Sequence, residues 1–300
     1  MCRNILASLI LKIEKYKMEK LPSISKLRAT IQPDPKKETV WYAKYVIRKV
    51  SIYFTWILLH TPVTANQATF IQAVLGIAGA AILAFGGYKW SILALLLIQL
   101  GYVFDCIDGE IARYRKKTSI NGIFLDSLNH ALVIPSIYLG LSIFSYYLVN
   151  ETWVLFVGAV LVIISANPVK KGMLSTMFYM LERRENPKYK FENMVQDKSL
   201  EQPSQYGQVG ENVIPKKKSL KSIIVAAAKD ISEYPTSMNI ITITVIADLL
   251  IHNYANWDFY PLSLFLVIVY TVFLILKEAF FLTKVYSKQT IEKKFVSFIR

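Results

Sequence analysis

The strongest constraint on the fold of this chain is a series of six apolar stretches, each near the length of a membrane-spanning helix. A helix needs about 20 mostly apolar residues to cross a bilayer. Charged residues make up only 19% of the chain, against about 25% in soluble domains. The sequence therefore predicts an all-α polytopic membrane protein and excludes an ordinary cytosolic enzyme and a disordered binder. The predicted transmembrane helices cover residues 68–85, 90–106, 123–148, 153–174, 238–251 with its flanks, and 260–282.

The fifth of these stretches is the weakest, because Asp248 lies within it. One interpretation is a carboxylate near the outer end of the helix, helped by the nearby His252. The other is a functional role, because acidic residues inside a membrane are often functional. The sequence leaves both open.

The distribution of basic residues predicts how the protein crosses the membrane. The chain has 35 Lys and Arg residues and a net charge of +14, and a six-span topology places all of them except Lys89 on one side. Cytoplasmic loops carry the excess of Lys and Arg. We therefore expect both termini to lie in the cytoplasm. The protein would be in the cell membrane if the source is prokaryotic. The positive charge then needs no nucleic-acid partner to explain it. The two cysteines, Cys2 and Cys106, are too few for a disulfide framework.

Several further regions are predicted around the spans. Residues 38–60 alternate apolar and basic side chains at helical spacing, which is typical of an amphipathic juxtamembrane helix on an anionic bilayer surface. The spans would form one domain over residues 61–286, with a polar cytoplasmic loop at 183–221. Basic segments precede and follow these regions, at residues 1–37 and 287–300.

Two predicted helix faces carry small and polar residues close to the cytoplasmic side. They hold Asp105, Asp108 and Ala112 on the second span, and Gly122, Asp126 and His130 on the third. Spacings of three, four, seven and eight residues place each set on one face of its helix. Because a short basic turn joins these two antiparallel helices, we expect three carboxylates and an imidazole to converge below the membrane surface.

Carboxylates gathered in this way point to a bound cation. They repel one another and cost desolvation energy, and a divalent ion relieves both. Oxygen ligands favour magnesium, manganese or calcium, and magnesium is usually shared with substrate phosphates. Gly109 and Gly122 would let a nucleotide or another backbone approach, and Arg113 could donate to a phosphate. Simple capping of helix ends would explain one or two of the acidic residues, but not the common register.

At these positions the chain resembles the CDP-alcohol phosphotransferases, also called CDP-alcohol phosphatidyltransferases. The motif of that family is Asp-x2-Asp-Gly-x2-Ala-Arg-x8-Gly-x3-Asp-x3-Asp. Residues 61–69 (Thr-Pro-Val-Thr-Ala-Asn-Gln-Ala-Thr) also resemble the element before the family's first span. Seven of the eight fixed motif positions match, at Asp105, Asp108, Gly109, Ala112, Arg113, Gly122 and Asp126.

The resemblance implies an activity and a set of site residues. Such proteins use Mg²⁺ or Mn²⁺ to move a substituted phosphate from a CDP-linked donor, such as CDP-diacylglycerol, to an alcohol acceptor. CMP is released, the products belong to phospholipid or related phosphodiester biosynthesis, and the proteins are commonly homodimers. By resemblance, the metal ligands are Asp105, Asp108 and Asp126, and the CDP group is held by Asn66, Gly109, Ala112, Arg113 and Gly122.

The chain departs from the family at His130, which occupies the position of the fourth aspartate. Imidazole can still remove a proton at neutral pH, so His130 could activate the acceptor hydroxyl beside a thinner metal site. Alternatively, the substitution disables the site and the protein binds a nucleotide or lipid without turnover. We favour the catalytic interpretation, because decay would not spare the other seven positions.

The acceptor is the part of the reaction that the sequence constrains least. A phosphorylated acceptor would need cations near the metal. Lys170 and Lys171 lie at the cytoplasmic end of the fourth predicted span, and Arg183 follows that span. The same residues could instead anchor that helix to anionic headgroups. Both interpretations stay open.

Overall fold

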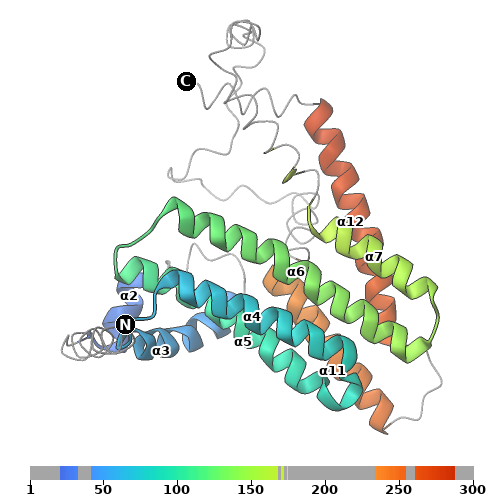
Figure 1. Ribbon diagram of the computed structural model, residues 1–300, viewed down its shortest axis with the longest axis horizontal. Coiled ribbons are helices and arrows are strands. Elements are labelled where there is room, and N and C mark those ends of the chain that lie inside the picture. The colour runs from blue at the N-terminus through green and yellow to red at the C-terminus, as the bar shows by residue number, and fades with distance from the viewer. Residues whose placement is uncertain are drawn as a thin grey trace, which may run out of the picture.

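The computed structural model describes residues 21–32, 42–167, 234–254 and 261–287, with the single positions 170, 171, 174 and 231. The elements in these ranges are helices, as the composition predicts. They are α2 (Ile24–Ile31), the π-helix η1 (Ala43–Ile47), α3 (Arg48–Leu59), α4 (Ala65–Phe85), α5 (Gly87–Tyr114), α6 (Ile120–Val149), α7 (Trp153–Ser165), α11 (Tyr234–Tyr254) and α12 (Leu262–Ser287) (Figure 1).

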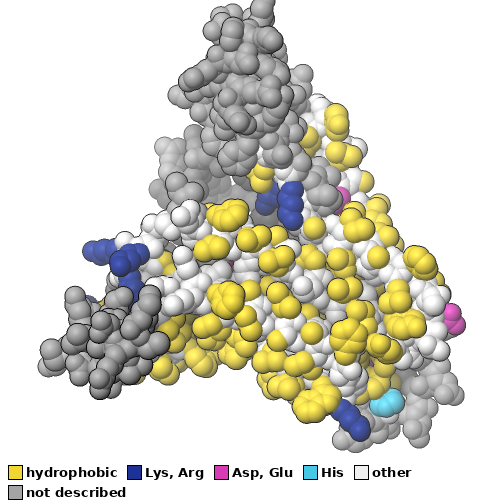
Figure 2. Space-filling model, viewed as in Figure 1, with side chains coloured by type: hydrophobic (Ala, Val, Ile, Leu, Met, Phe, Trp, Pro, Cys, Tyr) yellow, Lys and Arg dark blue, Asp and Glu magenta, His cyan; other side chains and the backbone are white. Residues whose placement is uncertain are grey.

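Five of these helices, α4, α5, α6, α11 and α12, are long and apolar enough to cross a membrane. Figure 2 shows hydrophobic side chains over most of the face in view, with Lys and Arg in a few small groups. The all-α prediction is confirmed for the described residues, and the five long apolar helices are consistent with a polytopic membrane protein. The fourth predicted span corresponds to α7, whose 13 described residues are shorter than the roughly 20 that a crossing needs. A sixth span and the orientation in the membrane stay predictions.

The predicted juxtamembrane helix corresponds to η1 and α3, and its residues 38–41 lie outside the described part of the chain. The outer surface of these two helices carries exposed apolar side chains, among them Tyr45, Tyr53 and Ile57. The predicted loop 183–221 with Arg183, and the C-terminal segment from residue 288, also lie outside the described residues.

Helices α4 and α6 both begin with a side-chain cap. At α4 the hydroxyl of Thr64 accepts from the backbone N–H of Gln67, whose side chain in turn accepts from the N–H of Thr64 at 2.8 Å. At α6 the hydroxyl of Ser119 accepts from the N–H of Gly122 at 3.0 Å. Between them, Arg115 donates to the carbonyl oxygens of Thr61 and Val63, which ties the loop before α4 to the end of α5. The two helix starts therefore lie together at one end of the molecule.

Helix α4 packs against both α5 and α6, and glycines bring the backbones close. A Cβ atom built on Gly79 would lie 2.8 Å from the carbonyl oxygen of Ala94 in α5, and one on Gly140 would lie 2.5 Å from that of Ala80 in α4. Small residues at such crossings let membrane helices approach closely. Figure 1 shows the three helices side by side, with α2 and α3 at the end where α4 and α6 begin.

The structure gives Asp248 hydrogen-bond partners on the neighbouring helix α12. Its carboxylate is buried and accepts from the backbone N–H groups of Leu262 at 2.6 Å and Ser263 at 2.8 Å. These residues begin α12, so Asp248 caps that helix from α11. His252 stacks on Tyr88, with ring centroids 4.3 Å apart. These contacts support a structural role for Asp248, as a cap of α12 that neither interpretation specified.

Candidate active site

Two carboxylates and an imidazole meet where α5 packs against α6. Nε2 of His130 lies 3.1 Å from Oδ1 of Asp105 and 3.4 Å from Oδ1 of Asp126. One potential ligand atom from each of the three residues lies within 4.8 Å of the others. This donor set, two hard oxygens and one nitrogen, fits a divalent cation such as Mg²⁺ or Mn²⁺. We call these three residues the carboxylate–imidazole cluster.

Asp108 lies one helical turn beyond Asp105 and outside this cluster. Only 9% of its surface is exposed, and its Oδ2 accepts from the Thr69 hydroxyl at 2.6 Å. Of the three acidic residues expected to bind metal, the structure thus brings Asp105 and Asp126 together with His130, which was expected to be a base. It directs Asp108 toward α4.

A cleft of about 200 Å³ joins the ends of α4, α5 and α6 beside the cluster. A second cavity of about 480 Å³ shares Asn66, Ala112 and Lys117 with it. The cleft brings together all five residues expected to hold the CDP group and two of those expected to bind metal. These residues are Asn66, Asp108, Gly109, Ala112, Arg113, Gly122 and Asp126.

The space next to Gly109 is filled by the side chain of Arg113. A Cβ atom at this position would lie 3.1 Å from Nη1 of Arg113. The guanidinium therefore lies across the glycine, and its Nε donates to the carbonyl oxygen of Ile31 at the end of α2. At Gly122 a Cβ would lie 3.3 Å from the Ser119 hydroxyl and 3.7 Å from the Asn66 side chain. Gly109 thus makes room for an arginine that lines the cleft.

Three polar residues without a predicted role line or support this site. Thr69 donates to Asp108, Gln72 donates from Nε2 to Oδ1 of Asp105 at 2.8 Å, and Lys117 lines both cavities. Asn66, Thr69 and Gln72 follow one another at intervals of three residues on an apolar helix. That spacing places them on one face, and it is the signal that could have identified them.

A fourth helix closes the site with an aromatic residue. Tyr234, at the start of α11, is buried, and its ring meets that of His130 nearly edge-on at a centroid distance of 5.3 Å. It also meets Tyr102 of α5 at 5.6 Å. Because Tyr234 is more than a hundred positions from His130 in the sequence, no local pattern could have indicated this contact.

The expected acceptor cations are not brought into this site by the described part of the chain. Lys170 and Lys171 are exposed and do not line either cavity, and Arg183 lies outside the described residues. Their role as acceptor-binding residues stays a prediction.

Comparisons with known proteins agree with the motif. The family model described as CDP-alcohol phosphatidyltransferase matches residues 62–190. A "Bifunctional IPC transferase and DIPP synthase" of Rubrobacter xylanophilus is 37% identical over 87 residues, which cover 28% of this chain and 19% of that relative. The chain thus spans about a fifth of the curated relative that it matches. The matched region contains the motif helices and the cleft between them, so over residues 62–190 the chain matches the CDP-alcohol phosphatidyltransferase family of enzymes.

Proposed function

We propose that this protein transfers a phosphatidyl group from a CDP-linked donor, such as CDP-diacylglycerol, to an alcohol acceptor and releases CMP. The observation that carries the proposal is the cleft between α4, α5 and α6, which is lined by six of the seven matched motif positions. This cleft shares Asp126 with the carboxylate–imidazole cluster. A nucleoside diphosphate bound there would have its phosphates beside the residues suited to hold a cation.

The cleft offers several groups that favour a diphosphate. Arg113 and Lys117 supply positive charge, and the guanidinium of Arg113 can donate more than one hydrogen bond to phosphate. The capped starts of α4 and α6 contribute the positive ends of two helix dipoles on the same side. The Asn66 amide can bond polar groups of the nucleoside.

Asp105 and Asp126 would hold the divalent cation, with Asp108 beside them and the imidazole of His130 next to the ion as a base and not as a ligand. Such an ion would neutralise charge on the diphosphate and stabilise the departing CMP. Gln72 and Thr69 keep the carboxylates of Asp105 and Asp108 oriented through the hydrogen bonds described above.

His130 would act as the base that accepts the proton of the acceptor hydroxyl, because imidazole accepts protons at neutral pH. The acceptor oxygen attacks the phosphorus that carries the diacylglycerol group. A new phosphodiester bond forms, the anhydride bond breaks, and its electron pair leaves with CMP. Holding both substrates in line makes a covalent enzyme intermediate unnecessary.

We further propose that the site faces the cytoplasm and that the protein works as a homodimer. The first part rests on the basic residues of the 115–117 turn, which lie at the site end of α5. The second rests on the resemblance to the family. The bilayer would supply the lipid donor directly to a site at the helix ends.

The proposal is tested by measuring CMP release from CDP-diacylglycerol with a panel of free and phosphorylated alcohols, in Mg²⁺, Mn²⁺ or EDTA. We expect release with at least one acceptor, its loss in EDTA, and its loss in Asp108→Asn and Asp126→Asn. Glu151→Gln, an exposed acidic residue between α6 and α7, is the matched control and should behave as the parent. CMP binding without release for every acceptor, together with activity gained in His130→Asp, would instead support the silent binding protein.

A further inference from the structure

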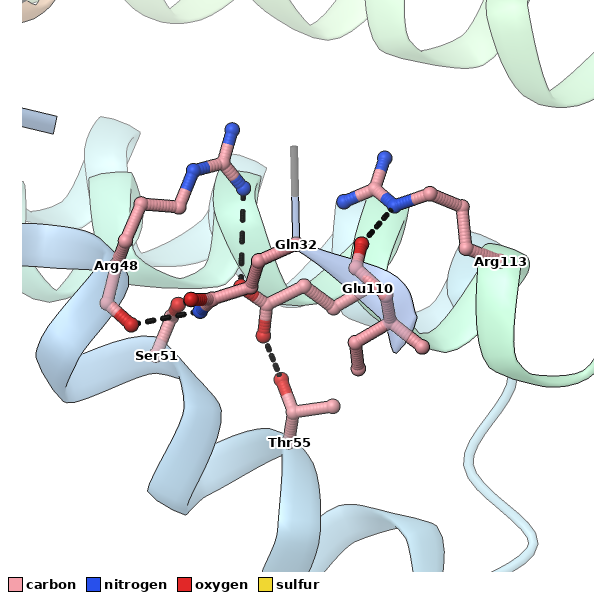
Figure 3. A network of polar contacts seen from close by, with 7 residues as sticks. Gln32, Arg48, Ser51, Thr55, Glu110 and Arg113 are labelled. Atoms are coloured by element: carbon pink, nitrogen blue, oxygen red, sulfur yellow. Dashed lines mark hydrogen bonds and ion pairs between the residues drawn. The ribbon is translucent and has the colours of Figure 1, made fainter. Parts of the chain in front are cut away.

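The turn that ends α2 makes direct contact with the last turns of α5 (Figure 3). Nε2 of Gln32 donates to the backbone carbonyl of Arg48 at 2.6 Å and to Oε1 of Glu110 at 2.8 Å. The carbonyl oxygen of the preceding residue, Ile31, accepts from Nε of Arg113. Two adjacent residues of the N-terminal segment therefore contact two residues within the family motif of α5.

Glu110 makes this contact specific. It is fully buried, and its carboxylate also accepts from the hydroxyls of Ser51 at 2.7 Å and Thr55 at 2.5 Å, with Nη1 of Arg48 at 3.7 Å. A buried carboxylate is tolerated only where hydrogen bonds and a cation compensate its lost hydration. All of these partners come from Gln32 and α3. The segment before α4 is therefore bound to α5 by polar contacts that an unrelated apolar surface could not replace.

The geometry of α5 explains how this contact reaches the cleft. At about 100° per residue, Glu110 lies about 200° around the helix from Asp108. Gly109 and Arg113 lie between these two directions. Asp108 points toward α4, Glu110 points toward α2 and α3, and Arg113 occupies the edge where both environments meet. Whatever holds the end of α2 thus also limits where the guanidinium of Arg113 can lie.

We propose that Gln32 is a positioning residue for Arg113. The hydrogen bond from Gln32 to Glu110 fixes the end of α2. The carbonyl oxygen of Ile31 is thereby held where it accepts from Nε of Arg113. The guanidinium is then fixed across Gly109, where it lines the cleft. An arginine oriented in advance loses less freedom when it binds phosphate. This inference rests on the proposed function, because it assigns Arg113 to the phosphates of the CDP group.

The test measures CMP binding to the full chain in detergent with Mg²⁺, by calorimetry, so that no turnover is needed. Gln32→Ala should weaken CMP binding about 3- to 10-fold, the range expected for one lost hydrogen bond. In an Arg113→Ala background the same change should have almost no further effect, because Gln32 acts through the arginine. Thr30→Ala is the matched control, since its exposed hydroxyl donates within α2, to the carbonyl oxygen of Lys26.

An exchange of the two polar partners provides a rescue. Gln32→Glu alone places a second carboxylate against Glu110 and should weaken CMP binding. Gln32→Glu combined with Glu110→Gln restores one carboxylate and one amide, and this double variant should recover part of the lost CMP affinity. If the effects of Gln32→Ala and Arg113→Ala simply multiply, or if Gln32→Ala lowers thermal stability alone, the positioning role is wrong and the proposed function is untouched. If the parent does not bind CMP, both are wrong.

Discussion

Replacing Gly140 with alanine should force α4 and α6 apart at a point where their backbones lie close together. A Cβ atom there would lie 2.5 Å from the carbonyl oxygen of Ala80 and 3.1 and 3.2 Å from the carbon atoms of the same backbone. Because ordinary contact begins at 3.4 Å, the shortfall is about 0.9 Å. No side-chain rotation can relieve a clash with backbone, so the helices themselves must separate.

Gly101 provides the matched control for this substitution. A Cβ atom on Gly101 would lie 3.5 Å from the carbonyl oxygen of Gln72 and from the amide nitrogen of Gly76, which is ordinary contact with α4. In both positions alanine gains helix propensity of up to about 1 kcal/mol. Only Gly140→Ala adds an overpacking cost of about 1–3 kcal/mol. The difference in free energy of unfolding between the two variants should therefore be about 1–3 kcal/mol.

The assay compares thermal unfolding of both variants in detergent with that of the parent, followed by CMP release at a permissive temperature. Gly140→Ala should unfold at lower temperature and turn over more slowly, because α4 carries Asn66 and Thr69 while α6 carries Asp126. Gly101→Ala should be as stable as the parent or more so. Equal unfolding temperatures for the two variants would refute the argument that backbone clearance between α4 and α6 limits stability.

Four further predictions concern other parts of the chain. His130→Ala should reduce CMP release by about 10²- to 10⁴-fold with CMP binding nearly unchanged, whereas parent-like activity would leave the histidine structural. His130→Asp should keep substantial activity and make the unfolding temperature depend more strongly on Mg²⁺, because three carboxylates then meet; an unfolding temperature that ignores Mg²⁺ would argue against a metal there. Asp248→Asn should destabilise the protein by about 1–2 kcal/mol through the weakened cap of α12, with CMP affinity unchanged, and a loss of CMP affinity would contradict a purely structural role. A cysteine at 253–257 should react with an impermeant reagent outside intact cells and one at 205 should not; the reverse pattern would invert the topology.

The helix register within the motif could be predicted from the sequence. Helical periodicity is a local property, so spacings of three and four residues place Asp105 with Asp108, and Asp126 with His130, whatever surrounds them. The apolar lengths of five spans and the capped start of α6 at Ser119 follow from equally local rules. These features needed no knowledge of how the helices pack.

The partners of each side chain across helices were decided by the tertiary structure. Asp105 meets His130 and Asp108 instead meets Thr69, because α4 lies against both α5 and α6 at glycine crossings. The arrival of Tyr234 beside His130 likewise depends on the packing of a distant helix. The neighbours of Glu110 in the sequence suggested no partner for it. Its hydrogen bond with Gln32 depends on how α2 packs against α5. Spacing along one helix determines which residues face the same way, but the close packing of several helices determines what they face.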